Sequence, residues 1–306
     1  MRAQALKPLL KRLLRIGGWA LSLLAIAFFV RLILRNGMAV PGHGAWEIIG
    51  VSTVSAVLYG LAVVLLGWLW TLLIVPDGGT DLVRPIAASY MKSQFAKYLP
   101  GNVFQYAARH ALGRRLGIDH GQLAAAAVVE AGMLVGAAAF IVMLLGTPVL
   151  LTLFPAAPVL PWPLAFIFPL ALAATTAAPR PGFPFLLRIP RYRFSRVLLG
   201  FTGYVLFFCI FGGLFQGLLA WCTGTQPDPL RVVPTSALAW LAGFFVPGAP
   251  AGAGLRETAL ALAAGDGKSS QATLAAIMLF RIATMGGDFL AFLLGSLLSR
   301  NHPKPE

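Results

Sequence analysis

The chain contains six apolar runs, each long enough to cross a lipid bilayer as a helix. A spanning helix needs about 20 apolar residues, and the runs lie at residues 17–34, 46–75, 123–146, 162–178, 197–221 and 272–298. Of the 306 residues, 58% are hydrophobic and only 11% are charged, which is too little polar surface for a soluble protein. The sequence therefore predicts an all-α polytopic membrane protein with about six transmembrane helices, and the proline-rich segment 150–161 predicts an interfacial loop.

Basic residues gather beside the apolar runs and indicate how the chain crosses the membrane. They cluster in residues 2–15 and 180–196, whereas residues 146–161 and 223–234 carry almost none. Cytoplasmic loops are enriched in Lys and Arg, so six crossings place both termini in the cytoplasm. We expect a multi-pass protein of the bacterial cytoplasmic (inner) membrane. The net charge of +14 then reflects topology, and no nucleic-acid partner is expected.

Two shorter apolar pieces, residues 86–99 and 235–246, lie between the long runs. As helices they would extend about 20 Å, less than the hydrocarbon core of roughly 30 Å. Each ends at a Pro-Gly pair, where a helix does not easily continue. We interpret them as first arms of re-entrant helical hairpins, with second arms at 102–116 and 251–264 that end at a glycine. An interfacial helix followed by a loop is the alternative.

The two halves of the chain share this layout. Residues 1–148 and 149–306 each contain three spans, with a hairpin (86–116 or 235–264) before the third. Because three crossings are an odd number, one hairpin enters from the cytoplasm and the other from outside. The pattern predicts an inverted repeat that forms one membrane domain, with the Pro-Gly tips meeting near mid-membrane. Broken helices at matching positions of two halves are typical of a transporter's binding site.

The second arm of each hairpin starts at the tip and is suited to bind an anion there. Its free backbone N–H groups and the positive end of the helix dipole favour a phosphate or a similar group. Gly101, Gly252 and Gly254 let the backbone approach a ligand, and Asn102 is a good helix cap. The alternative is that these glycines only permit the bend and close packing.

Charged residues stand inside two of the spans and just beyond both tips. They are Glu130 in the third span, Arg281 and Asp288 in the sixth, Arg109 after the first tip, and Arg256 and Glu257 after the second. A charge at the centre of a lone helix costs roughly 2.5–3.5 kcal/mol, so we expect Arg109 to pair with Glu130 and Glu257 with Arg281. Asp288 lies on nearly the same face as Arg281 and is an alternative partner for it. Either the pairs only lock hairpins to spans, or an anionic headgroup competes for Arg109 and Arg281.

No catalytic or metal-binding pattern stands out. The histidines are scattered without metal-ligand spacing, at His43, His110, His120 and His302. The chain has no Walker loop for a nucleotide. We expect no metal, cofactor or catalytic residue, although an embedded enzyme acting on a lipid phosphate remains an alternative.

The residues around both tips resemble the paired motifs of a known family. The first motif reads Ser93-Gln-Phe-Ala-Lys-Tyr-Leu-Pro-Gly-Asn102, followed by Arg109, and the second spans residues 246–257, followed by Arg281. They are similar to motifs in the flippase-like transmembrane region of lysylphosphatidylglycerol synthases and their stand-alone relatives. The matching positions are Lys97, Tyr98, Pro100, Gly101, Asn102 and Arg109, then Pro247, Gly248, Pro250, Gly252, Gly254, Arg256, Glu257 and Arg281.

This chain departs from the family's pattern in two places. The second motif reads Pro-Ala-Gly-Ala-Gly where the family more often has Pro-Gly-Gly-x-Gly, and no soluble aminoacyl-transferase domain follows residue 298. The resemblance therefore implies a stand-alone member that moves a polar lipid between leaflets, and it does not imply lysyl-lipid synthesis.

The predicted function is a lipid flippase that binds an anionic or polar headgroup at the hairpin tips. The lipid would be a phospholipid, a glycolipid or a polyprenyl-phosphate-linked lipid. The alternative is a non-transporting subunit that scaffolds a lipid-modifying or glycosyltransferase enzyme, and a homo-oligomer is open in either case. The candidate binding residues are Lys97, Tyr98, Pro100, Gly101, Asn102, Arg109, Glu130, Pro247, Gly248, Gly252, Gly254, Arg256, Glu257, Arg281 and Asp288.

Overall fold

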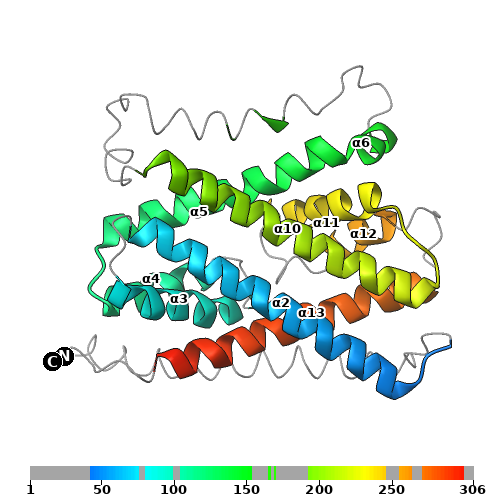
Figure 1. Ribbon diagram of the computed structural model, residues 1–306, viewed down its shortest axis with the longest axis horizontal. Coiled ribbons are helices and arrows are strands. Elements are labelled where there is room, and N and C mark those ends of the chain that lie inside the picture. Colours follow the sequence, from blue (N-terminus) through cyan, green and yellow to red (C-terminus); the bar gives the residue numbers. More distant parts are fainter. Residues whose placement is uncertain are drawn as a thin grey trace, which may run out of the picture.

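The protein is described by a computed structural model in which every element is a helix (Figure 1). The structure describes residues 42–75, 80–98, 104–153, 165–166, 169, 192–245, 255–263 and 271–299, and these contain no strand. The helices are α2 (Ala45–Ile74), α3 (Thr80–Gln94), η1 (Phe95–Tyr98), α4 (Phe104–Arg115), α5 (His120–Leu145), α6 (Thr147–Leu153), α10 (Phe194–Thr223), α11 (Pro229–Phe245), α12 (Leu255–Ala263) and α13 (Gln271–Leu298). The predicted all-α class is confirmed for the described residues.

Four helices, α2, α5, α10 and α13, are long and apolar enough to cross a membrane. They confirm four of the six predicted spans, with ends within three residues of those expected. The predicted span at 17–34 lies outside the described residues, and that at 162–178 lies outside them except for Ala165, Phe166 and Pro169.

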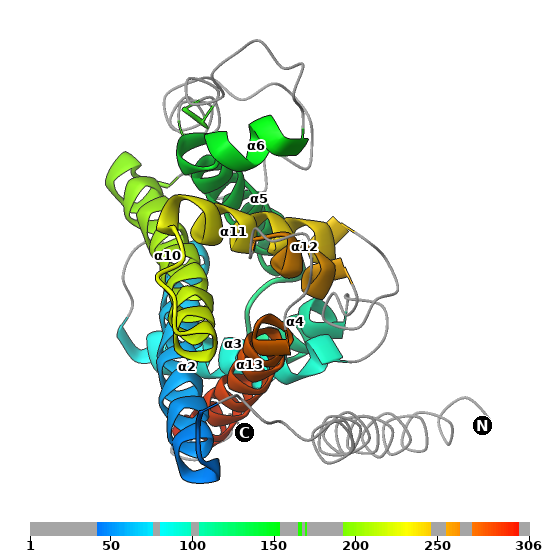
Figure 2. The ribbon, with the colours of Figure 1, turned by 90° about the vertical axis from the view of Figure 1, so that its right-hand side faces the viewer.

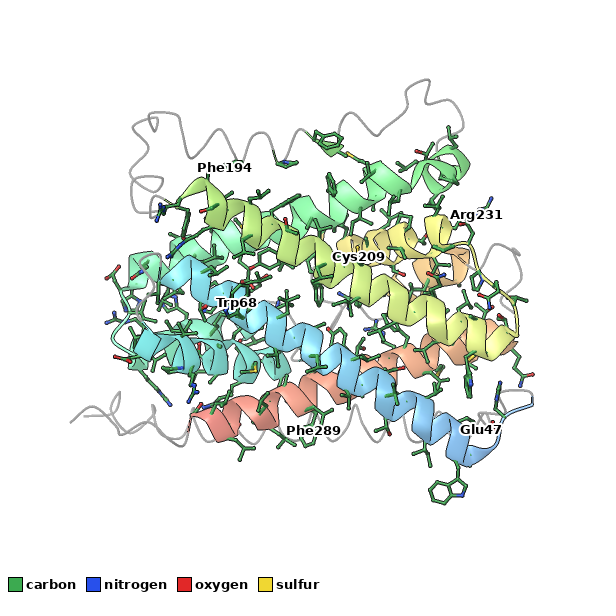
Figure 3. The ribbon with its side chains drawn as sticks, viewed as in Figure 1. Glu47, Trp68, Phe194, Cys209, Arg231 and Phe289 are labelled. Atoms are coloured by element: carbon green, nitrogen blue, oxygen red, sulfur yellow. The ribbon has the colours of Figure 1, made fainter. Side chains whose placement is uncertain are left out.

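Apolar side chains cover the outside of the four long helices as well as their packed faces. Trp68 of α2 and Phe289 of α13 are both about two-fifths exposed and lie on the outside of the bundle (Figure 3). A helix that is apolar on all sides is typical of a membrane span, because lipid replaces water around it. The described part of the chain is thus a multi-pass membrane protein.

Helices α2 and α13 run in one direction and α5 and α10 in the opposite one, so their ends gather at two opposite poles of the molecule. At one pole, Tyr192 before α10 donates a hydrogen bond to the Leu73 carbonyl (2.9 Å), and Gln122 of α5 donates to Ile74 (2.7 Å). At the other pole, the His43 ring stacks on Trp221 with centroids 3.9 Å apart. The starts of α5 and α10 thus lie at the pole where α2 ends, and the end of α10 lies at the pole where α2 begins.

Two pairs of shorter helices lie at the two opposite poles of the bundle of long helices. Helix α3 packs against α4 next to α2 and α13, and α11 packs against α12 next to α10 and α5. In Figure 1 the α3–α4 pair lies on the left, where α2 ends, and the α11–α12 pair lies on the right, where α10 ends. Seen end-on in Figure 2, both pairs and the long helices surround a common centre.

The first arms of both pairs start earlier than the sequence predicted. We expected them to begin at Ile86 and Thr235, directly after a proline, but α3 begins at Thr80 and α11 at Pro229. Each proline is the sixth residue of its helix. A proline there removes a single backbone hydrogen bond, and the helix continues through it in both cases.

The end of the first hairpin's second arm agrees with the prediction, whereas the proline-rich segment is helical at its start. Helix α4 ends before Gly117, as expected, with φ at +82° in the left-handed region that glycine favours. The loop predicted at 150–161 is wrong for its first four residues, which belong to α6. Pro148 is the second residue of α6, where a missing N–H is tolerated. Residues 154–161 lie outside the described residues.

Candidate functional site

A cavity of about 300 Å³ lies among the shorter helices and the middle of the long ones. Its volume is at the lower end of the range for small-ligand sites. Three basic side chains and one carboxylate line it: Lys97, Arg109, Arg256 and Glu130. The other lining residues are aromatic, amide or apolar: Tyr59, Leu66, Tyr90, Gln94, Gln105, Tyr106, Leu134, Phe207, Trp240, Gly243, Phe244 and Phe245.

Lys97, the penultimate residue of η1, is anchored to two long helices. Its Nζ bonds both carboxylate oxygens of Asp288 on α13, at 2.8 Å and 2.7 Å, and reaches the Tyr59 hydroxyl of α2 at 3.4 Å. The neighbouring Tyr98 donates to Asp288 Oδ2 at 2.5 Å. Asp288 is fully buried, and these bonds to Lys97 and Tyr98 satisfy both of its oxygens, as a buried carboxylate requires.

The contacts of Lys97 show how far η1 extends along the spanning helix α2. Tyr59 is the fifteenth residue of the 30-residue helix α2, so it lies roughly 22 Å from either end of that helix. Helix α3 starts at the pole where α2 ends, yet Lys97 contacts the midpoint of α2. The α3–η1 segment therefore runs from one pole to the middle of the spanning helices.

Arg109 of α4 forms the second charged cluster. Its Nη1 is ion-paired with Glu130 Oε2 of α5, and its Nε donates to Ser93 Oγ at 3.3 Å. Both Arg109 and Glu130 are buried. This pair was expected from the sequence and is confirmed.

Aromatic rings enclose the Arg109 guanidinium. Its central carbon lies 3.8 Å from the ring centroid of Tyr90, 4.6 Å from that of Trp70 and 5.5 Å from that of Tyr106. A guanidinium stacks on aromatic faces because their π-electrons attract a cation. The rings hold the guanidinium in place while its remaining N–H groups stay available to a ligand.

Two buried polar atoms near Arg109 have no hydrogen-bond partner within the described chain. They are Glu130 Oε1 and the Tyr204 hydroxyl of α10. The Tyr90 hydroxyl lies beside the carboxylate without completing a bond to Oε1. An unsatisfied buried polar atom is costly, so this part of the cavity is suited to water, a proton or a polar ligand.

Arg256 enters the cavity from the opposite pole. It is the second residue of α12, and its guanidinium lies 6.0 Å from the Phe211 ring of α10. Phe211 stands about 18 Å from the nearer end of its helix. The start of α12 thus reaches the same central region as η1. Arg281, also buried, lies on α13 seven residues before Asp288.

Basic side chains outnumber carboxylates in the described lining of the cavity. Lys97, Arg109 and Arg256 are basic and Glu130 is acidic, and the Asp288 carboxylate lies directly behind Lys97. Basic side chains gathered in one cavity attract an anionic ligand.

The structure brings together most of the predicted residues whose side chains it describes, whereas the buried Arg281 is not among the residues that line the cavity. Lys97, Arg109, Glu130 and Arg256 line one cavity, and Tyr98 and Asp288 lie directly behind Lys97. The alternative pairing of Asp288 with Arg281 is replaced by its bonds to Lys97 and Tyr98. Several predicted positions lie outside the described residues: Pro100, Gly101, Asn102, Pro247, Gly248, Gly252, Gly254 and the Glu257 side chain.

The sequence analysis missed the aromatic and amide lining. Tyr59 carried a usable signal, because a tyrosine in the middle of a span is far from the membrane interface where this residue usually lies. Gln94 and Gln105 carried none, since glutamine in a short helix has many ordinary roles.

Metal ligation has no support in the described chain. No group of three or more His, Cys, Asp or Glu residues there is placed to hold a metal ion. His110 and His120 share a short contact of 2.7 Å between ring nitrogens, but His110 is half-buried in the middle of α4, His120 is exposed at the start of α5, and neither lines the cavity.

The chain has no match among protein-family models, curated proteins or solved structures. The functional assignment therefore rests on the geometry and chemistry of the cavity.

Proposed function

We propose that this protein is a flippase that moves a lipid with an anionic or polar headgroup between the leaflets of a bacterial cytoplasmic membrane. The observation that carries the proposal is the position of a cavity lined by Lys97, Arg109 and Arg256 at the midpoint of spanning helices. A phosphate headgroup crosses the hydrocarbon slowly because it must lose its water. A polar cavity at that depth offers it replacement partners.

The lining matches the parts of such a headgroup. Arg109 and Arg256 offer N–H donors to phosphate oxygens, and arginine is well suited to that geometry. The amides of Gln94 and Gln105 and the Tyr106 hydroxyl are placed for the hydroxyl or sugar groups that accompany a phosphate. The acyl tails would stay in the surrounding lipid.

The arrangement of the shorter helices supports a re-entrant, inverted-repeat architecture with six spans. The α3–α4 and α11–α12 pairs occupy opposite poles, and Lys97 and Arg256 bring both to the middle of the long helices. Pro85 and Pro234 each stand at the sixth position of the first arm. Opposed half-helices meeting at a central site are typical of secondary transporters.

The distribution of charge supports termini in the cytoplasm. The described basic residues at the pole shared by α3, α4 and the start of α10 are Arg84, Lys92, Arg114, Arg115, Arg193 and Arg196. At the other pole the described residues include Arg231 with the acidic Glu47 and Asp228. The positive-inside rule places the first pole in the cytoplasm. The resemblance to the flippase-like region of lysylphosphatidylglycerol synthases agrees with this reading, and we propose membership as a stand-alone relative.

Lipid movement in proteoliposomes tests the function directly. Phosphatidylcholine vesicles with trace fluorescent phosphatidylglycerol are treated with an impermeant quencher, which reports the probe in each leaflet. We expect fast probe movement with the natural protein and none with Arg109→Ala or Arg281→Ala.

The matched control for these variants is Arg231→Ala, an exposed arginine at one pole. It should leave movement unchanged. Because Arg109→Ala leaves Glu130 unpaired, the double variant Arg109→Gln/Glu130→Gln removes both charges and keeps similar volumes. Normal probe movement in a monodisperse double variant and in Arg281→Ala would contradict the proposed role of the cavity.

A non-transporting scaffold for a lipid-modifying or glycosyltransferase enzyme is favoured by one observation. Both ion pairs, Arg109–Glu130 and Lys97–Asp288, join a shorter helix to a long one. If the protein is such a scaffold, Arg109→Ala and Arg281→Ala would lower its thermal stability and the amount of partner enzyme that co-purifies with it. The natural protein alone would then move no lipid.

A further inference from the structure

The two buried carboxylates of the central region are satisfied to different degrees. Both oxygens of Asp288 are bonded, by Lys97 and Tyr98. Glu130 lines the cavity; its Oε2 is bonded by Arg109 and the Tyr90 hydroxyl lies beside the carboxylate, while Oε1 has no partner within the described chain. Glu130 therefore has an oxygen that can accept a proton without breaking an existing bond.

Arg109 is the only described positive charge in contact with Glu130. The titratable groups that face this carboxylate from the neighbouring elements are Arg109 and Tyr106 of α4, Tyr90 of α3 and Tyr204 of α10. Helix α6 has no charged residue, and the single charged residues of α2 and α11, Glu47 and Arg231, stand in the first turns of their helices. Glu130 thus depends on one counter-ion.

An anionic headgroup that binds Arg109 withdraws that counter-ion. An ionised carboxylate left alone in a buried, largely apolar site is far costlier than a neutral carboxylic acid. We propose that Glu130 takes up one proton for each anionic headgroup that binds Arg109, so that the lipid and the proton cross together.

The exchange balances in charge. The Arg109–Glu130 pair opens, the headgroup oxyanion takes the guanidinium, and a proton from water joins the Glu130 carboxylate. The site gains one negative and one positive charge, so its net charge does not change. Release on the other side reverses each step. Because this coupling rests on the flippase function proposed above, the test must separate the two.

Calorimetric titration in buffers of different ionisation enthalpy counts the protons taken up on binding. The probe is short-chain phosphatidylglycerol, a phosphodiester whose charge is constant near neutral pH. For the natural protein we expect about one proton per lipid bound, and an affinity that falls about tenfold per pH unit where Glu130 is ionised in the free protein. Glu130→Gln should bind the probe with no proton uptake and no pH dependence.

The matched control is Glu47→Gln, which changes an exposed carboxylate at the start of α2 and should leave the proton count unchanged. Binding by the natural protein without proton uptake would overturn the coupling and leave the flippase function standing. Persistent uptake in Glu130→Gln would overturn the assignment to Glu130. Failure of the natural protein to bind the probe would overturn the flippase function itself.

A second measurement needs no variant. In proteoliposomes with a pH difference of one unit, we expect the probe to accumulate about tenfold in the leaflet on the alkaline side, because one proton accompanies each lipid. Equal distribution despite fast movement would overturn the coupling even if Glu130→Gln does not fold.

Discussion

At the residue scale, the central feature is an arginine whose position is fixed before any ligand arrives. Glu130 and Ser93 bond Arg109 from two sides, and Tyr90 and Trp70 cover its flat faces. A site that is ordered in advance loses less free energy on binding, because few side chains must become ordered with the ligand.

Arg109→Lys keeps the charge and tests the geometry. Lysine lacks the planar fork and stacks poorly on rings, and a cation–π contact contributes about 0.5–2 kcal/mol. We expect phosphatidylglycerol binding to weaken about tenfold, as measured by calorimetry. Arg114→Lys, at an exposed position on the same helix, is the control. Equal affinities in the two variants would show that the stacked geometry contributes nothing.

Asp288→Asn tests the cluster that anchors η1. It leaves Lys97 with a buried charge and no carboxylate, and breaking a buried pair in this way costs about 3–5 kcal/mol. We expect a clearly lower unfolding temperature in detergent, restored in part by Lys97→Met/Asp288→Asn, in which the charge is absent. A double variant less stable than Asp288→Asn would argue against the pair.

At the element scale, close helix packing in the centre depends on small residues. Gly60 of α2 faces Gly287 of α13, and a Cβ added at Gly287 would lie 2.6 Å from the Ala56 carbonyl oxygen. Small residues let helices in a membrane approach closely, where packing replaces the hydrophobic effect as the source of stability. This contact brings Tyr59 and Asp288 near the same lysine.

Gly287→Val should push α2 and α13 apart. Overpacking a close contact costs about 1–3 kcal/mol, and the displacement would also weaken the Lys97–Asp288 bonds. We expect a lower unfolding temperature and reduced probe movement. Gly213→Val on α10, where an added Cβ meets nothing within 4 Å, is the matched control. Similar stability of both variants would contradict the packing role of Gly287.

The sequence predicted the long helices well because a run of about 20 apolar residues has few alternatives to a membrane span. It placed the start of each first arm too late, because a proline resembles a boundary even where the helix continues through it. The Arg109–Glu130 pair was predictable because a buried charge needs a partner. The Lys97–Asp288 pair was not, since no sequence pattern links residues that lie 191 positions apart.

At the scale of the whole molecule, the proposed architecture places the two shorter helix pairs on opposite sides of the membrane. Labelling of single cysteines with an impermeant maleimide tests this. In a background with Cys209→Ala and Cys222→Ala, we expect Arg115→Cys to react only from the cytoplasmic side and Gln226→Cys only from the outside. Both positions are exposed. Labelling of both from the same side would contradict the inverted arrangement.

The claim that the central cavity holds a lipid headgroup is tested most directly by photo-crosslinking with a phosphatidylglycerol that carries a diazirine on its headgroup. In nanodiscs, mass spectrometry should find adducts on cavity residues such as Gln94, Gln105 and Tyr106, and these should disappear in Arg109→Gln/Glu130→Gln. Adducts confined to the two poles and to outward residues such as Trp68 and Phe289, in both proteins alike, would contradict a headgroup site in the cavity.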